Sequence, residues 1–243
     1  MASTQAQPGF MRRDRDESGF FNGIPFLQSA VQSVPVGEGL TARFFLSEDL
    51  FNSGSVCEGR ALFALLCSPG DAVPVAVLDA TVLSRGTGRG MGVSDSGDLL
   101  SESLNKVVNA LSKTCVEDLL GVVSRGGILV LNRLEVRTDY NHLGIGLRFF
   151  TAITERVNNH FKLALYALHP FPLQYEYCEP DAESPEYEAF WESFRLDVEK
   201  LSNFYCYEFG CKSPSVDESL LINAFSGWQL NIDRFGWTVV LSE

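Results

Sequence analysis

The residues best placed to do chemistry lie in a glycine loop between a strand-like run and a helical pattern. Ile128–Val136 is apolar, and residues 141–147 read NHLGIGL. Apolar residues then recur at helical spacings: Leu147, Phe150, Ile153, Val157 and Phe161. The first turn of a helix has backbone N–H groups without partners and a partial positive charge. Because glycines let a ligand approach the backbone closely, the amides from Leu143 to Leu147 are a candidate phosphate site.

A plain tight turn is the competing interpretation of these glycines. Phe149 stands where a third glycine of a dinucleotide-binding fingerprint would fall, and no Gly-Lys-Ser/Thr ending marks a P-loop. The local pattern alone leaves the anion site and the turn open.

The segment from Val136 to Gly146 resembles the pyrophosphate loop of the GNAT N-acetyltransferases. That family has Arg/Gln-x-x-Gly-x-Gly/Ala after a strand ending in Leu-x-Val, and Asn141 stands here where the family has Arg or Gln. The resemblance implies acetyl-CoA as cosubstrate and an α/β fold with a mixed central sheet. It further implies that the pantetheine arm of CoA contacts the backbone of Leu134 and Val136. The implied pyrophosphate site comprises Asn141, His142, Leu143, Gly144, Ile145, Gly146 and Leu147.

Candidates for the catalytic acid follow from the same resemblance, and candidates for the base follow from the residues near the motif. The segment FYCYEFGC at 204–211 is similar to the family's Tyr-x-x-x-Gly-Phe, with Cys206 at the tyrosine position. Tyr205 is the first choice for the acid that protonates the departing thiolate, and Tyr207 is the second. Both tyrosines also fit a purely structural role as amphipathic helix residues. For the base, Glu135 lies in the motif strand, and His169 follows the next apolar run.

The composition and charge limit the kinds of partner that the protein is expected to bind. The net charge is −12 and the pI is about 4.7, which disfavours a nucleic-acid binder and suits either a cationic amine acceptor or simply a soluble surface. Three histidines and six cysteines without a Cys-x-x-Cys motif predict no metal site. The absence of an apolar leader predicts a cytoplasmic protein with reduced thiols, and no apolar run is long enough for a membrane span. The oligomeric state stays open, with a homodimer among the options.

Patterns along the chain predict one domain over residues 19–243 after a disordered tail at 1–18. A short helix is predicted within Phe20–Val36, and an insertion with one or two helices at about 84–124. A Ser-Pro pair at 184–185 predicts a helix start, and Gly210 the end of that long helix. Six runs read as strands: Thr41–Leu46, Cys57–Cys67, Val73–Leu83, Leu163–Leu168, Gly227–Ile232 and Gly236–Leu241. With Ile128–Val136, these runs predict a mixed sheet with flanking helices, in which the strands before and after the motif helix are parallel.

The sequence therefore favours an N-acetyltransferase that transfers an acetyl group directly from acetyl-CoA to an amine. The alternative is a non-catalytic module of the same fold that binds CoA or a protein partner. A third hypothesis is a nucleotide site at the glycine-rich loop Gly86–Gly92, although a flexible loop explains that composition better.

Overall fold

A computed structural model describes residues 31–47, 57–71, 73–86, 102–117, 119–175, 179–214, 220–233 and 236–242. The predicted disordered tail and nearly all of the glycine-rich loop lie outside these residues.

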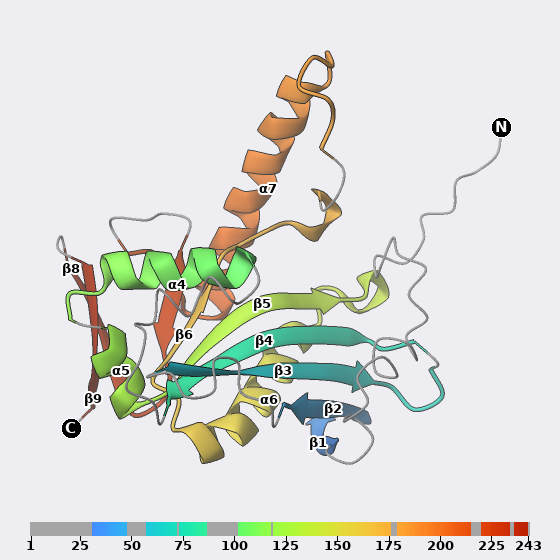
Figure 1. Ribbon diagram of the computed structural model, residues 1–243. Coiled ribbons are helices and arrows are strands. Elements are labelled where there is room, and N and C mark those ends of the chain that lie inside the picture. The colour runs from blue at the N-terminus through green and yellow to red at the C-terminus, as the bar shows by residue number, and fades with distance from the viewer. Residues whose placement is uncertain are drawn as a thin grey trace.

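A seven-stranded sheet forms the centre of the fold, and its strands follow one another in chain order (Figure 1). They are β1 (Gln32–Gly37), β2 (Leu40–Leu46), β3 (Cys57–Cys67), β4 (Ala76–Arg85), β5 (Ile128–Val136), β6 (Leu165–Leu168) and β7 (Leu221–Ala224). All neighbours are antiparallel except β5 and β6, which are parallel. The structure thus confirms the predicted α/β class, the mixed sheet and the parallel pair.

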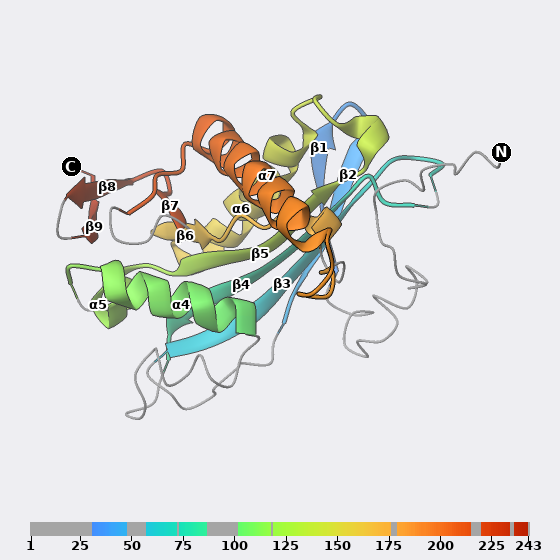
Figure 2. The same ribbon diagram turned by 90° about the horizontal axis from the view of Figure 1, so that it is seen from above.

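Helices cover both faces of this sheet (Figure 2). Helix α6 (Ile145–Phe161) packs on one side with Leu129 and Leu131 of β5, and we call this side the α6 face. Helices α4 (Glu102–Thr114) and α5 (Leu119–Arg125) pack on the other side with Ile128 and Val130, which we call the α4 face. Both helices fall in the predicted insertion. Two short 3-10 helices, η1 (Thr138–Tyr140) and η2 (Leu173–Tyr175), complete the helical elements of the described residues.

The last two strands form a separate hairpin of β8 (Trp228–Asp233) and β9 (Gly236–Leu241). Trp237 is fully buried in the cluster formed by α4 and α5, and its Nε1 donates a hydrogen bond to Thr114 Oγ1 at 2.8 Å. The hairpin therefore anchors the inserted helices to the end of the chain.

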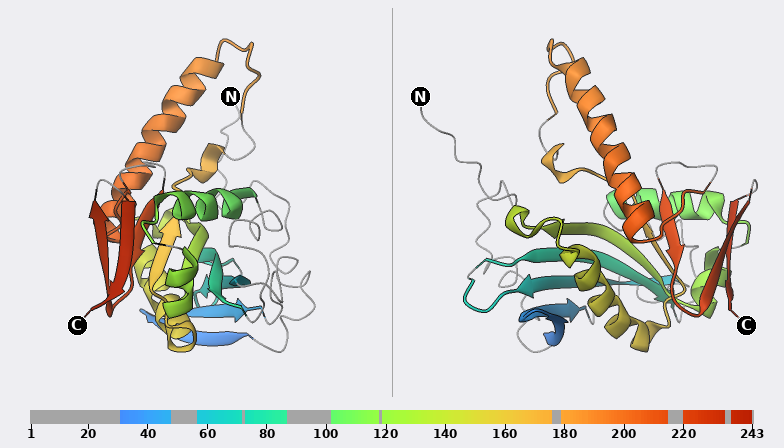
Figure 3. Two further views of the ribbon diagram at one scale, coloured as in Figure 1. Left: turned by 60° about the vertical axis from the view of Figure 1, so that its left-hand side comes forward. Right: turned by 180° about the vertical axis from the view of Figure 1, so that it is seen from behind.

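Helix α7 (Tyr187–Glu208) rises away from the sheet, and Tyr205 is its buried residue (Figures 1 and 3). The predicted start at Ser184-Pro185 is wrong, because the helix begins at Tyr187. Ser184 instead accepts the backbone N–H of Glu186 through its hydroxyl oxygen, which forms a turn before the helix. Gly210 adopts a φ of 65°, as expected for a residue that ends a helix.

Two strands were not predicted from the sequence. β1 occupies Gln32–Gly37, so the helix expected within Phe20–Val36 is wrong over its described part. Its alternating half-exposed and exposed residues are typical of an edge strand, whose apolar signal is weak. β7 has only four residues, and β4 begins at Ala76 rather than Val73.

Gly126, between α5 and β5, allows a close approach that positions the motif strand. An added Cβ would lie 2.7 Å from the carbonyl oxygen of Lys162 and 2.8 Å from the Trp228 ring. We expect Gly126→Ala to lower the free energy of unfolding by about 1–3 kcal/mol through overpacking. Gly121→Ala in α5 is the matched control, because its Cβ would meet nothing nearer than 3.7 Å and alanine favours a helix. Urea unfolding measures both, and an unchanged midpoint for Gly126→Ala would contradict this packing.

Candidate functional site

The glycine loop leads directly from the end of β5 into α6. After η1, Asn141 is extended, and Gly144 caps the helix with φ 66° and ψ 13°. His142 also has a positive φ, of 64°. These left-handed conformations turn the chain sharply, so that α6 starts beside the strand that precedes it. Gly146 allows this contact, because an added Cβ there would lie 3.2 Å from Cγ2 of Val136.

In the part of the chain that the structure describes, the amides of this loop after Asn141 make no backbone hydrogen bonds, and the residues of its first part are exposed. The first hydrogen bond of the helix runs from the N–H of Arg148 to the carbonyl of Gly144. Within the described part of the chain, the N–H groups from His142 to Leu147 have no backbone acceptor. The loop from Asn141 to Gly144 is exposed, and the space above Gly144 is open. This is the geometry that an anion needs at a helix N-terminus.

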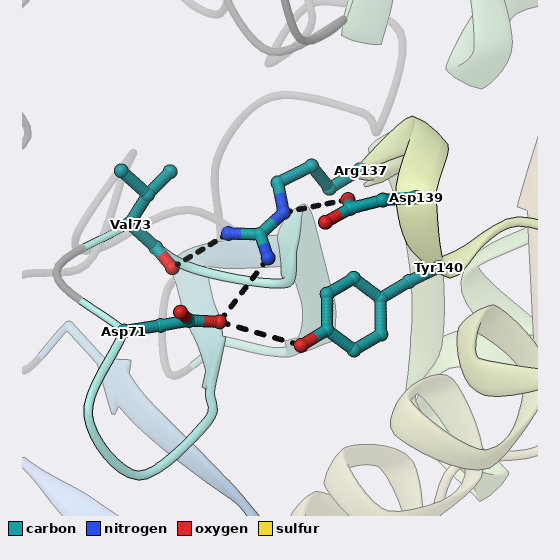
Figure 4. A network of polar contacts seen from close by, with 5 residues as sticks. All are labelled: Asp71, Val73, Arg137, Asp139 and Tyr140. Carbon is teal, nitrogen blue, oxygen red and sulfur yellow. Dashed lines mark hydrogen bonds and ion pairs between the residues drawn. The ribbon is translucent and has the colours of Figure 1, made fainter.

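A network centred on Arg137 holds the loop in place (Figure 4). Its guanidinium donates to Asp139 at 2.7 Å, to Asp71 at 3.1 Å and to the carbonyl of Val73 at 3.3 Å. The hydroxyl of Tyr140 also donates to Asp71, at 3.3 Å, and Arg137 lies 4.8 Å from the centre of the Tyr140 ring. The hydrogen bond to Asp139 is the main cause of the raised pKa of Arg137. The network ties the loop to the turn between β3 and β4.

A second arginine lies beside the amides themselves. Arg148 donates to the carbonyl of Leu143 at 3.3 Å and forms a two-pronged ion pair with Glu38 at 2.9 and 3.3 Å. The hydrogen bond from Arg148 lowers the pKa of the Glu38 carboxyl. The site thus has a cation in its first helical turn, although Asn141 is neutral. Neither arginine was among the predicted site residues.

One backbone edge of β5 is open next to this loop. β6 pairs with β5 only from Ile128 to Leu131, and no described strand pairs with that edge from Asn132 onward. The N–H of Arg137 donates to Val75, which precedes β4. Since backbone groups alternate sides along a strand, those of Leu134 and Val136 point to the open edge. These are the two residues whose backbone was expected to contact a bound arm.

On the α4 face, polar side chains gather where β5 and β6 separate. The pairing of β4 with β5 is irregular between Asp79 and Ala80, where Asn132 is an extra residue. The side-chain nitrogen of Asn132 donates to Asp79 and to Thr81, both at 3.3 Å. Arg133 lies opposite Asp79 and forms a 3.4 Å ion pair with Glu135. We call this group the polar patch: Asp79, Thr81, Asn132, Arg133 and Glu135.

Asp79 is the most perturbed carboxyl of the patch. Burial raises its pKa from 3.8 to about 6, while the hydrogen bond from Asn132 and the charge of Arg133 act in the opposite direction. Glu135 was among the predicted site residues, and Asp79 was not. The sequence does contain a signal for Asp79, because a lone carboxylate in the apolar run Ala76–Arg85 is unusual for a central strand.

The predicted base His169 follows the last residue of β6 directly. It is half-buried and lies at the level of Asn132, because Leu168 pairs with Leu131. The structure therefore brings His169 and Glu135 to the same end of the parallel pair. His142, in contrast, lies exposed in the glycine loop.

The two candidate tyrosines have opposite environments. Tyr205 is 7% exposed and belongs to the core cluster on the α6 face, with its ring centre 5.1 Å from that of Phe209. Burial raises the pKa of Tyr205, so its hydroxyl is neutral near physiological pH. Tyr207 is 87% exposed. Only Tyr205 is enclosed by the fold.

Hydrogen bonds to β6 and β7 fix the end of α7 that carries Tyr205. The hydroxyl of Tyr166 donates to the carbonyl of Phe209, and the side-chain nitrogen of Asn223 donates to the same carbonyl at 2.9 Å. Asn223 also donates to the Tyr166 hydroxyl oxygen at 3.1 Å. The last turn of α7 is thereby held against the strand next to the opening.

No protein-family model matches this chain, and no curated protein is similar to it. Among the described residues, no group of His, Cys, Asp or Glu is arranged to hold a metal ion. None of the helices in the described ranges combines the length and apolar character that a membrane crossing requires.

The raised pKa of the half-buried Asp79 carboxyl leads to a stability prediction. Its pKa is higher in the fold than in the unfolded chain, so its contribution is fully favourable below about pH 3.8 and is lost as the pH rises through about 6. Asp79→Asn removes the loss of stability at high pH, because the amide does not ionise, and it keeps an acceptor for Asn132. A pKa change from 3.8 to about 6 corresponds to about 3 kcal/mol, so we expect the variant to be more stable by up to that amount at pH 7.5.

Urea unfolding at pH 4.0 and pH 7.5 measures this difference. Asp181→Asn, in the exposed loop before α7, is the matched control. An Asp79→Asn variant that gains no stability between the two pH values would show that the carboxyl is solvated.

Proposed function

We propose that the protein is an N-acetyltransferase of the GNAT type that transfers an acetyl group from acetyl-CoA to an amine. One observation carries the proposal. The parallel strands β5 and β6 separate after four residue pairs, and the opened edge of β5 leads to a helix N-terminus with available amides. An opening for an extended arm and an anion site at its end are what CoA requires.

The residues of the chain fit this cosubstrate. Its pyrophosphate would be held by the amides from His142 to Leu147, with Arg148 as the nearby cation. The backbone of Leu134 and Val136 would pair with the amides of the pantetheine arm, as an added strand does. From Val136 back to Asn132, the strand spans about 13 Å at about 3.3 Å per residue, which brings the reacting end to the polar patch.

The chemistry then needs an oxyanion donor, an acid and a base. A backbone N–H on the open edge of β5, beside the polar patch at the reacting end of the arm, would stabilise charge on the thioester oxygen. Tyr205, neutral and enclosed, would protonate the departing thiolate. The acceptor would be an amine, cationic in solution, which agrees with the net charge of −12.

A non-catalytic CoA-binding module is the second candidate. It is favoured by Asn141, a neutral residue where the GNAT pattern has Arg or Gln, and by the engagement of Arg148 with Glu38. The two functions differ in one measurement. The enzyme releases CoA thiol when an amine is present, whereas the module binds CoA and releases none.

The proposed pyrophosphate site is tested by adding charge and bulk at Gly144. We expect Gly144→Glu to weaken acetyl-CoA binding by at least tenfold in calorimetry, because a carboxylate would enter the space meant for phosphate. Asn141→Ala is the control within the same loop. It should weaken acetyl-CoA binding by tenfold at most, since a neutral hydrogen bond contributes about 0.5–1.5 kcal/mol. If a folded Gly144→Glu variant binds acetyl-CoA like the wild type, the site is elsewhere.

The acid is tested by a matched pair of tyrosines. Tyr205→Phe removes one hydroxyl and keeps the ring, so we expect turnover to fall by about 10²–10⁴-fold with acetyl-CoA affinity nearly unchanged. Tyr207→Phe should leave turnover unchanged, because that ring is exposed. Thiol release and calorimetry measure the two effects. A loss confined to Tyr207→Phe would show that the motif is aligned incorrectly, and full turnover in both variants would assign the proton to solvent.

A further inference from the structure

Asp79 is a half-buried carboxylate in a central strand. Its strand neighbours Leu78 and Ala80 point to the α6 face and are fully buried. On its own face, Asp79 lies opposite Phe63 of β3 and Arg133 of β5. Because partial burial of a carboxylate costs free energy, packing alone does not account for an acid at this position.

The position of Asp79 relates it to the opening between β5 and β6. Its oxygen accepts a hydrogen bond from the side chain of Asn132 at 3.3 Å. Asn132 is itself exposed, and it is the first residue of β5 beyond the last pair with β6. The carboxyl therefore lies one side chain away from the point where the two strands separate.

The inserted helices leave this part of the α4 face accessible. Val130, two residues before Asn132, is fully buried in the cluster that contains Leu104 and Val107 of α4. Asn132 is exposed. An acceptor would thus reach the opening over the polar patch, with the inserted helices beside it.

The two other carboxyl or imidazole candidates are less suited to accept a proton. Glu135 forms an ion pair with Arg133 at 3.4 Å, so its carboxylate is already engaged within the patch. His169 lies at the level of Asn132 but directly after β6, and it is followed by the buried Pro170. His169 is kept as the competitor in the experiment below.

We propose that the polar patch binds a primary amine as its ammonium ion and that Asp79 is the base that removes a proton from it. This inference rests on the proposed N-acetyltransferase function, which it extends to the class of acceptor and to the identity of the base. Asn132 orients the carboxyl, and Arg133 with Glu135 keeps the rest of the patch close to neutral.

The proton transfers balance in this scheme. The ammonium loses one proton to Asp79, and the neutral nitrogen forms a bond to the thioester carbonyl carbon. The bond from that carbon to sulfur breaks, and its electron pair stays on sulfur. The sulfur takes a proton from the Tyr205 hydroxyl. The nitrogen then gives its second proton to the tyrosine oxygen, which restores the hydroxyl. Asp79 then releases its proton to solvent, so that amide, free thiol and one proton are the products.

A base with a pKa near the working pH is more effective than an ordinary aspartate, because it is both ionised and basic enough to accept the proton. The pKa of Asp79, about 6, meets this condition. The charged groups of the neighbouring strands are Arg133 and Glu135 on β5, with His169 at the end of β6. The facing residue of β3 is Phe63, and α4 contributes apolar side chains to this face.

The experiment uses the full chain with acetyl-CoA and a panel of primary amines: spermidine, a lysine-containing peptide and a peptide with a free N-terminus. Thiol release gives kcat and kcat/KM for the amine from pH 5 to 9, and calorimetry gives the acetyl-CoA affinity. Wild-type kcat/KM should rise with pH along a limb centred near 6, because kcat/KM reports the pKa of the free enzyme. Asp79→Asn should reduce kcat at least 100-fold, remove that limb and keep the acetyl-CoA affinity within twofold. Asp79→Glu should restore part of the activity and the limb.

Several outcomes would overturn the assignment. If Asp79→Asn keeps kcat within threefold, Asp79 is not the base. If instead His169→Gln removes the limb while Asp79→Asn retains it, the base is His169. If the wild type binds acetyl-CoA but releases no thiol with any amine, the proposed function fails and the role of Asp79 with it. Asp181→Asn, in the loop before α7, controls for the loss of a surface charge.

Discussion

The separation of β5 from β6 is the constraint on which the candidate site depends. Two local features cause it. Pro170 and Pro172 follow β6 and cannot donate the backbone hydrogen bonds that a longer ladder needs. On the other strand, the extra residue Asn132 disrupts the regular alternation of β5 at the same level. The parallel pair therefore ends after Leu131 and Leu168, and everything beyond that level on β5 has one open edge.

The rest of the structure holds this opening in place from both sides. On the α6 face, Tyr166 and Asn223 fix the last turn of α7, which carries Tyr205. On the α4 face, the inserted helices bury the first half of β5 and leave Asn132 exposed. The end of α7 that carries Tyr205 is thus fixed on the α6 face, and the polar patch lies on the α4 face.

Much of this framework could be predicted from the sequence, because strong periodic signals determine it. The runs of β3 and β5 are continuous and apolar, and the helical spacing from Leu147 to Phe161 is regular, so their type and order were correct. The parallel pairing followed from the intervening helix. The edge strand β1 and the four-residue β7 were missed because such short or half-exposed strands are stabilised by pairing with their neighbours, a tertiary effect that leaves little local pattern.

The site was predictable only where it consists of backbone. The glycine loop can be recognised from its residues, since the conformation that Gly144 adopts is a property of glycine itself. Its side-chain partners cannot be recognised in this way. Arg148 meets Glu38 across 110 positions of the chain, and Asn132 reaches Asp79 across 53. Such pairs depend on strand register, which the sequence does not state.

This division between backbone and side chain also bears on the proposed anion site, whose loop has the neutral Asn141 where the GNAT pattern has Arg or Gln. An anion at a helix N-terminus is held mainly by N–H groups and by the helix dipole, and both are present whatever residue precedes the turn. The turn must be held in a fixed position, and Arg137 holds it there by joining the loop to Asp71 and Val73. The positive charge is supplied one turn later by Arg148, where Glu38 keeps the guanidinium beside the loop. In the proposed site, the positive charge would therefore come from Arg148 within the helix and not from residue 141 in the loop. The geometry of the amides does not depend on this difference.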